Sequence, residues 1–230
     1  MRLNRVFEAA AAPLSGISAA VFAGLSAGRR KRIFHPRGIT FEGTLTFHDG
    51  NPLPFEGAER ALVRFSKAAG FPQGVPDLFG LAIKLPDAGQ DLLLVTAGED
   101  AVTRHLLVPA TGFFRRAYST VLPYEWGGEL IVLGARPDPP LVHASGQEMD
   151  DLPALVAAGR LRFDLTWGRA GTSDVETFAS LVVDRQHEGD VAFNPFNSHP
   201  SLKPAGGLNR LRRDSYERSQ QARPDSDRVA

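Results

Sequence analysis

The sequence predicts a mainly β, α+β protein: an antiparallel β-barrel with flanking helices at both termini. Apolar and polar residues alternate with a period of two from Ile39, which is typical of a strand that buries one face, and seven short segments in all are expected to be strands. Turns rich in Gly and Pro separate these segments, and the 230 residues include 23 Gly and 17 Pro. The chain has no fixed-period repeat and no low-complexity tract, so a single barrel is the simplest arrangement.

The expected strands follow one another from residue 39. In the first, residues 39–47, Ile39, Phe41 and Leu45 alternate with polar side chains. The others are expected at 61–66, 78–85, 92–96, 129–134, 160–167 and 178–184. Residues 101–121 lack the alternation and are expected to be helical or irregular. A short helix is expected at 152–158, with Asp150 and Asp151 capping its N-terminus.

Composition excludes several classes of protein. Hydrophobic residues make up 43% and charged residues 23%, an ordinary globular composition. The 26 Lys and Arg balance 26 Asp and Glu, which argues against a dedicated nucleic-acid binder. Cysteine is absent. That excludes disulfides, cysteine-ligated zinc, iron–sulfur clusters, cysteine nucleophiles and a thiolate haem ligand.

The balanced charge is distributed unevenly along the chain. Residues 1–37 carry seven basic residues and one acid, and residues 201–230 carry seven basic residues and four acids. Residues 38–200 therefore have a net charge of −9. The basic ends either pair with the acidic middle or converge on an anionic ligand, and charge alone leaves both readings open.

We divide the chain into three parts. Residues 1–28 contain an Ala-rich run that Pro13 and Gly16 interrupt, too broken to span a membrane. The run ends in four basic residues without a clear small-residue cleavage site. We expect a docking helix or arm of a cytoplasmic protein, with an export signal or membrane-surface anchor as the alternative. Residues 29–224 are the expected barrel domain, and 225–230 a frayed tail.

The C-terminal segment carries the first candidate site. In a helix, Arg212 and Tyr216 lie about 40° apart and Arg212 and Arg223 about 20° apart, with Ser219 near the same face. A guanidinium one turn from a phenol stabilises the phenolate. A phenolate is a hard ligand that suits ferric iron, and tyrosine is a known proximal haem ligand. The alternative is an arginine-rich surface helix whose tyrosine packs inward.

A second candidate site precedes and follows the first strand. His35 stands in a basic loop before that strand, and Arg64 and Ser66, two residues apart, share one face of the next. A serine hydroxyl facing His35 would fix its tautomer and leave the other ring nitrogen free for proton transfer. The alternative is a loop histidine in a basic patch.

Together these motifs resemble the catalase family. Arg32–Gly38 matches the distal pattern R-x-x-H-x-x-G, and Val63–Ser66 matches V-R-F-S letter for letter. Phe79–Leu85 is similar to the strand R-G-F-A-x-K-F. The proximal pattern R-x-x-x-Y-x-x-[ST]-x-x-x-R is matched by Arg212, Tyr216, Ser219 and Arg223. The order is that of catalases, and the resemblance covers about residues 30–224.

The similarity is closest to shortened catalase-like haem proteins, including the allene oxide synthase type. It implies haem b as cofactor, with Tyr216 as the iron ligand and Arg212 as its charge partner. It implies His35 as the distal acid–base group and Ser66 as its hydrogen-bond partner. The remaining cofactor-binding residues are Arg32, Arg64 and Arg223, which would hold the propionates, and Ser219 of the proximal motif.

The sequence departs from the catalase pattern at the distal asparagine. Where catalases read D-L-V-G-N-N, residues 91–97 read D-L-L-L-V-T-A. Val95 stands near the asparagine position, and Thr96 is the nearest polar group and a further candidate catalytic residue. Loss of a preorganised amide donor is expected to slow peroxide chemistry about 100-fold. High catalase turnover is therefore not expected.

The resemblance implies a haem-dependent oxidoreductase that acts on hydrogen peroxide or on organic, including fatty-acid, hydroperoxides. Its reaction would be peroxidatic, a dehydration or an isomerisation. Two alternatives remain: a non-catalytic haem sensor or carrier, and a haem-free barrel that binds an apolar ligand or a protein. The oligomeric state stays open, with a homo-oligomer among the alternatives.

Overall fold

The computed structural model of the chain describes residues 37–138 and 149–205. The strands are β1 (Arg37–Phe47), β2 (Ala58–Lys67), β3 (Phe79–Leu85), β4 (Gln90–Thr96), β5 (Tyr118–Ser119), β6 (Tyr124–Trp126), β7 (Glu129–Pro137), β8 (Arg162–Arg169), β9 (Glu176–Gln186) and β10 (Lys203–Pro204). Helix α2 (Leu152–Ala157) and two 3₁₀ turns, η1 (Thr103–His105) and η2 (Met149–Asp151), complete the described elements.

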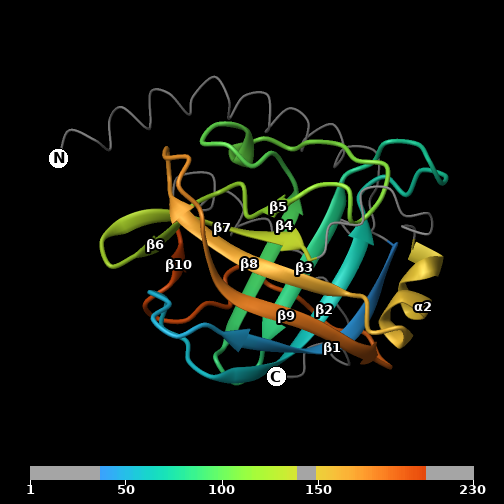
Figure 1. Cartoon of the computed structure of the whole chain (residues 1–230), viewed down its shortest axis with the longest axis horizontal. Coiled ribbons are helices and arrows are strands. Elements are labelled where there is room, and N and C mark those ends of the chain that lie inside the picture. The colour runs from blue at the N-terminus through green and yellow to red at the C-terminus, as the bar shows by residue number, and fades with distance from the viewer. Residues whose placement is uncertain (1–36, 139–148, 206–230) are drawn as a thin grey trace, which may run out of the picture.

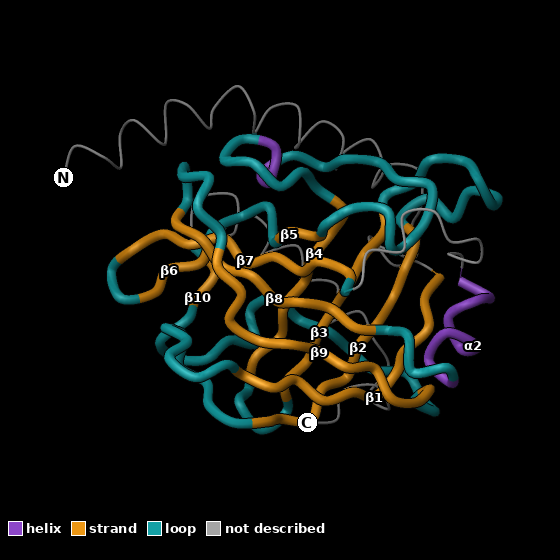
Figure 2. The backbone as a smooth tube through the Cα atoms, viewed as in Figure 1, coloured by secondary structure: helices purple, strands orange, loops and turns teal. Residues whose placement is uncertain are grey.

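The strands form a closed antiparallel barrel (Figure 1). Eight of them run in the order β7–β5–β4–β3–β2–β1–β9–β8, and the pairing of β8 with β7 completes the circle. Strands β6 and β10 extend the sheet beyond β7. Figure 2 shows α2 at one side of the barrel and a long loop between β4 and β5. The predicted antiparallel barrel is confirmed.

All seven predicted strands are present, with ends that differ by a few residues. The sequence did not indicate β5, β6 and β10, because strands of two or three residues are too short to show a period. Apart from η1 and β5, residues 101–121 are irregular, as one of the two expectations had it. The short helix is confirmed, but the predicted cap is wrong. Asp151 makes no capping hydrogen bond, because the 3₁₀ turn η2 leads directly into α2.

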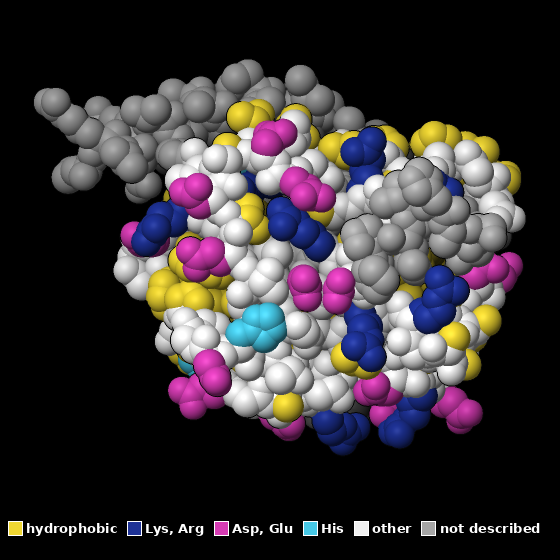
Figure 3. Space-filling model, in the orientation of Figure 1, with side chains coloured by type: hydrophobic (Ala, Val, Ile, Leu, Met, Phe, Trp, Pro, Cys, Tyr) yellow, Lys and Arg dark blue, Asp and Glu magenta, His cyan; other side chains and the backbone are white. Residues whose placement is uncertain are grey.

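Three further expectations lie outside the described residues: the docking helix or arm of residues 1–28, the helices flanking the barrel and the tail of residues 225–230. In the part of the chain that is described, no helix is long and apolar enough to cross a membrane. On the face shown in Figure 3, acidic and basic side chains are interspersed rather than gathered into one patch of either sign.

Aromatic side chains fill the barrel interior. Phe65 of β2 is fully buried and contacts the rings of Phe41, Phe113, Phe114 and Phe163, with centroids 5.5–6.3 Å away. Phe113 and Phe114 come from the loop before β5, so this loop closes the core from one end. The interior of the barrel is therefore a packed core.

A buried carboxylate organises the loop between β2 and β3. Asp77 is 4% exposed, and its carboxylate accepts the backbone N–H groups of Ala69, Gly70, Phe71 and Leu78 at 2.7–3.1 Å. Four donors on one carboxylate satisfy a buried charge that would otherwise be destabilising.

We expect Asp77→Ala to lower the free energy of unfolding by about 2–3 kcal/mol, because it leaves four partly buried backbone N–H groups without their acceptor. Urea denaturation measures the loss, with Asp49→Ala as the control because Asp49 is exposed. Equal stabilities of the two variants would contradict this account.

Candidate functional site

Strands β2, β3 and β4 present one face to the interior and the other to the outside of the barrel. Phe65, Leu81 and Leu94 are cross-strand neighbours, at most 5% exposed, and they face the interior. Successive side chains of a strand point to opposite faces. Arg64 and Ser66, on either side of Phe65, therefore lie together on the outer face.

Small residues form a line across this outer face. Ser66 is in register with Gly38 of β1 and with Gly80 of β3, and Gly80 is in register with Val95 of β4. We call Gly38, Ser66, Gly80 and Val95 the outer row. A Cβ atom at Gly38 would lie 2.7 Å from the Arg64 Nε atom. This position therefore requires glycine if Arg64 is to keep its place beside the row.

Arg64 lies half-enclosed next to the outer row. Its side chain is 15% exposed, and its Nη1 atom is 3.7 Å from Oδ1 of Asp190, whose side chain is 62% exposed. Asp190 follows the end of β9. The contact shows that a carboxylate reaches this guanidinium from outside the barrel.

Ser66 and Thr96 lie on different faces. Ser66 is 5% exposed, and its hydroxyl donates a long 3.5 Å hydrogen bond to the Gly80 carbonyl. Thr96 is fully buried on the interior face, where its Oγ1 accepts the Phe79 N–H at 3.3 Å. Val95 occupies the outer row, so its neighbour Thr96 must point the other way. The structure does not bring Thr96 to Ser66, and we leave Thr96 out of the proposed site.

The other predicted site residues lie outside the described residues: Arg32, His35, Arg212, Tyr216, Ser219 and Arg223. The four described histidines all have hydrogen-bond partners; the His187 Nδ1 atom is 3.0 Å from Glu42, and the His105 Nδ1 atom is 2.8 Å from the Val121 carbonyl. Burial lowers the pKa of His105. Within residues 37–138 and 149–205, no three His, Asp or Glu side chains cluster where they would hold a metal ion.

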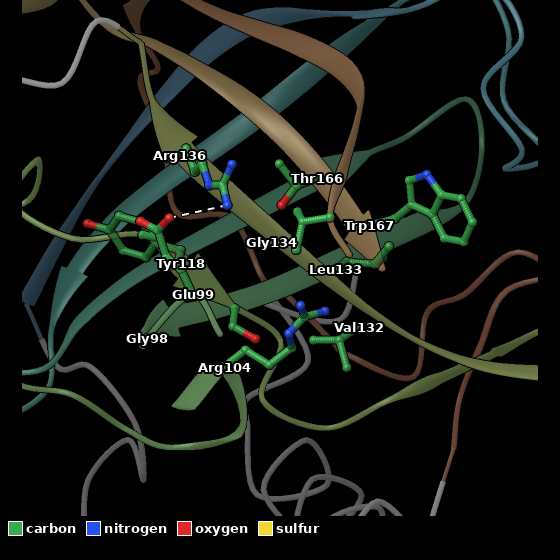
Figure 4. Close-up of a pocket in the computed structure, with 13 residues that line it drawn as sticks. Gly98, Glu99, Arg104, Tyr118, Val132, Leu133, Gly134, Arg136, Thr166 and Trp167 are labelled. Atoms are coloured by element: carbon green, nitrogen blue, oxygen red, sulfur yellow. Dashed lines mark ion pairs between the residues drawn. The ribbon is translucent and has the colours of Figure 1, made fainter. Parts of the chain in front are cut away.

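The outer row continues onto β5, β7 and β8, where sequence reasoning expected no site. Val95 is in register with Ser119, Ser119 with Gly134, and Gly134 with Thr166. A pocket with about 30 Å³ of free space opens here (Figure 4). Its polar lining comes from Glu99, Arg104, Ser119, Arg136 and Thr166. We call it the Arg104 pocket.

No protein-family model and no curated protein sequence matches the chain. Among solved structures, the chain is similar to catalase A from Saccharomyces cerevisiae, with a TM-score of 0.64 and 12% sequence identity. The match covers 88% of this chain and 63% of the catalase A chain. At this identity the similarity shows the fold alone: the chain has a catalase-like barrel.

Proposed function

We propose that the chain binds haem b against the outer row and acts as an oxidoreductase on hydrogen peroxide or organic hydroperoxides. The four sequence motifs in catalase order and the catalase-like barrel support this proposal. The observation that carries it is the pairing of Gly38 with Ser66, because the distal motif Arg32–Gly38 ends at that pair.

Chain length limits how far His35 is from Ser66. His35 precedes Gly38 by three residues, and three residues span at most about 11 Å. Gly38 is directly opposite Ser66, so the distal motif and the V-R-F-S motif meet at this pair of residues. This favours the pairing of a distal histidine with a serine that the motifs imply.

The described residues fit a flat group with two carboxylates. Three of the four members of the outer row are Gly or Ser, so a planar ring can approach the strands closely. Arg64 lies beside the row and already contacts one carboxylate, that of Asp190. A guanidinium in this place suits a haem propionate.

We assign the remaining roles from the motif match. Tyr216 would be the iron ligand and Arg212 its charge partner, with Ser219 in the same motif. The propionates would be held by Arg32, Arg64 and Arg223. Bound haem supplies a redox-active ferric iron. His35 would take a proton from one peroxide oxygen and return it to the other, while Ser66 holds its ring in one tautomer.

A second candidate function is a haem sensor or carrier without catalysis. It rests on Val95, a half-buried apolar side chain in the outer row at the expected position of the distal amide. Without that donor, peroxide lacks one oriented hydrogen bond. The two candidates differ in one respect: only the enzyme loses hydroperoxide turnover in His35→Ala.

Tyr216→Phe tests the proposal directly. We expect the wild-type protein titrated with haem to give a ferric, tyrosinate-type absorption spectrum, and the variant to lose it, because phenylalanine has no oxygen ligand. The other two tyrosines supply matched controls. Tyr118 is buried with its hydroxyl donating to the Phe113 carbonyl at 2.7 Å, and Tyr124 is 4% exposed.

Tyr118→Phe and Tyr124→Phe are therefore expected to keep the haem spectrum. Absence of haem uptake by the folded wild-type protein would overturn the proposal. An unchanged spectrum in Tyr216→Phe would remove the ligand assignment, and turnover that survives His35→Ala would remove the distal one.

A further inference from the structure

Arg104 is a buried arginine with an unused donor. It lies in η1 and is 5% exposed, and its Nε donates to the Asp100 carbonyl at 3.3 Å. Its Nη2 atom is buried without a hydrogen-bond partner. Burial lowers the pKa of Arg104; among the nearby charges, Asp100 and Asp174 raise this pKa and Arg136 lowers it. A buried charged donor without an acceptor is unfavourable, so its position calls for an explanation.

Two glycines allow η1 to lie against the barrel wall. A Cβ atom at Gly98 would be 1.9 Å from the Thr103 Oγ1 atom, and a Cβ atom at Gly168 of β8 would be 2.7 Å from the Arg104 Nη1 atom. A side chain at Gly98 would push the turn away from the sheet, and one at Gly168 would meet the Asp174 carbonyl oxygen at 2.3 Å as well as the guanidinium. The backbone is thus shaped to admit the guanidinium.

Asp100 fixes the same turn from the solvent side. Its carboxylate accepts the N–H groups of Val102 and Thr103 at 2.9 and 2.8 Å and the Thr103 hydroxyl at 2.6 Å. These hydrogen bonds, that of the Thr103 hydroxyl first, lower the pKa of Asp100 to about 2. The turn therefore holds Arg104 firmly at neutral pH.

Val121, two residues after the end of β5, has a strained backbone and links η1 to β5 through hydrogen bonds. Val121 has a φ of 61°, in the left-handed region that a β-branched residue rarely adopts. The Val121 carbonyl accepts the His105 Nδ1–H at 2.8 Å, and its N–H donates to the Ser119 Oγ at 3.0 Å. Strain of this kind persists where the surroundings over-determine the conformation. The two hydrogen bonds of Val121 thereby hold Ser119 near η1.

The Arg104 pocket lies where these parts meet. Figure 4 shows Arg104 and Arg136 on either side of Gly134, with Thr166 next to it. A Cβ atom at Gly134 would be 2.7 Å from the Thr166 Oγ1 atom, so glycine keeps the pocket floor open. The free space of about 30 Å³ admits one particle of the size of a water molecule or a monatomic ion.

The charged side chains around the pocket differ in their exposure to solvent. The acids are near solvent: Glu99 is 55% exposed and pairs with Arg136 at 3.2 Å, and Asp100 and Asp174 are exposed. Solvent screens exposed charges much more than buried ones. Arg104 is the one buried charge among these groups of the pocket, so solvent screens it least.

We propose that the Arg104 pocket binds a small monatomic anion of the size of chloride. The anion would accept hydrogen bonds from Arg104 and from the hydroxyls of Ser119 and Thr166, with Arg136 at the mouth. Binding of this anion does not require haem, so the test uses the protein without added cofactor.

The test compares the melting temperature in sodium chloride with that in sodium gluconate at equal ionic strength, because gluconate is too large for the pocket. We expect a saturable rise with chloride only. Thr166→Val removes one donor at nearly constant volume and is expected to weaken the chloride dependence about tenfold. Glu99→Gln removes the carboxylate that competes with chloride for Arg136, and it is expected to strengthen the chloride dependence of the melting temperature.

Arg104→Gln is expected to abolish the chloride response. Arg169→Gln is the matched control, because Arg169 is an exposed arginine of β8 that pairs with Glu129. Circular dichroism checks that Arg104→Gln folds; if it does not, the two milder variants decide. Equal melting temperatures of the wild type in both salts would overturn the proposal. So would an unaltered chloride dependence in Thr166→Val and Glu99→Gln, or bromide-soaked crystals without an anomalous peak in the pocket.

Discussion

Phe65→Ala is expected to lower the free energy of unfolding by about 4 kcal/mol. Phe65 is fully buried and contacts four aromatic rings from three other parts of the barrel, two of them from the loop before β5. Its removal leaves a cavity that rigid strands cannot close. Because Arg64 and Ser66 flank it, the same change loosens the strand that carries the outer-face residues.

Chemical denaturation of the variant and the wild type measures this loss. The control is Phe71→Ala, since the Phe71 side chain is 51% exposed and its hydrogen bonds are made by backbone atoms. We expect the control to change stability by less than about 0.5 kcal/mol. A loss below about 2 kcal/mol in Phe65→Ala would mean that the rings repack.

Under the proposed function, Val95→Asn is expected to raise hydrogen peroxide turnover of the haem-loaded protein about 100-fold. The substitution places an amide donor in the outer row, next to Gly80 and two strands from Ser66. A preorganised donor aimed at developing charge contributes this much in other enzymes. Val95 is half-buried, so the polar side chain keeps access to solvent and the fold tolerates it.

Leu93→Asn is the matched control for this gain. Leu93 lies on the same face of β4, is also half-buried and is two residues from Val95, in register with Ala82 instead of Gly80. Initial rates of peroxide loss, normalised to bound haem, measure the effect. Equal rates in both asparagine variants would show that Val95 is not beside the reacting group.

The long strands could be predicted from the sequence because each has enough residues to show the alternation of buried and exposed positions. That rule also places Arg64 and Ser66 on one face, as the structure has them. Applied to β4, it would have put Thr96 inside the barrel. Thr96 was predicted as a site residue because it is next to Val95 in the sequence. Neighbouring residues of a strand face opposite ways, so this prediction does not follow from the strand pattern.

The Arg104 pocket had no signal in the sequence. Arg104 belongs to an irregular segment, and Ser119 belongs to a strand of two residues. Gly134 and Thr166 are 32 positions apart and meet only through the pairing of β7 with β8. Such a site depends on strand order and register, which local patterns do not specify.

The line from Gly38 to Thr166 crosses seven strands of the barrel in continuous register. Its side chains point away from the aromatic core, so the residues of the two proposed sites and the core residues lie on opposite sides of the same strands. Val95 is half-buried, whereas Ser66, Ser119 and Thr166 are at most 5% exposed. Val95 is therefore the position among these four at which a library of substitutions costs the least folded protein.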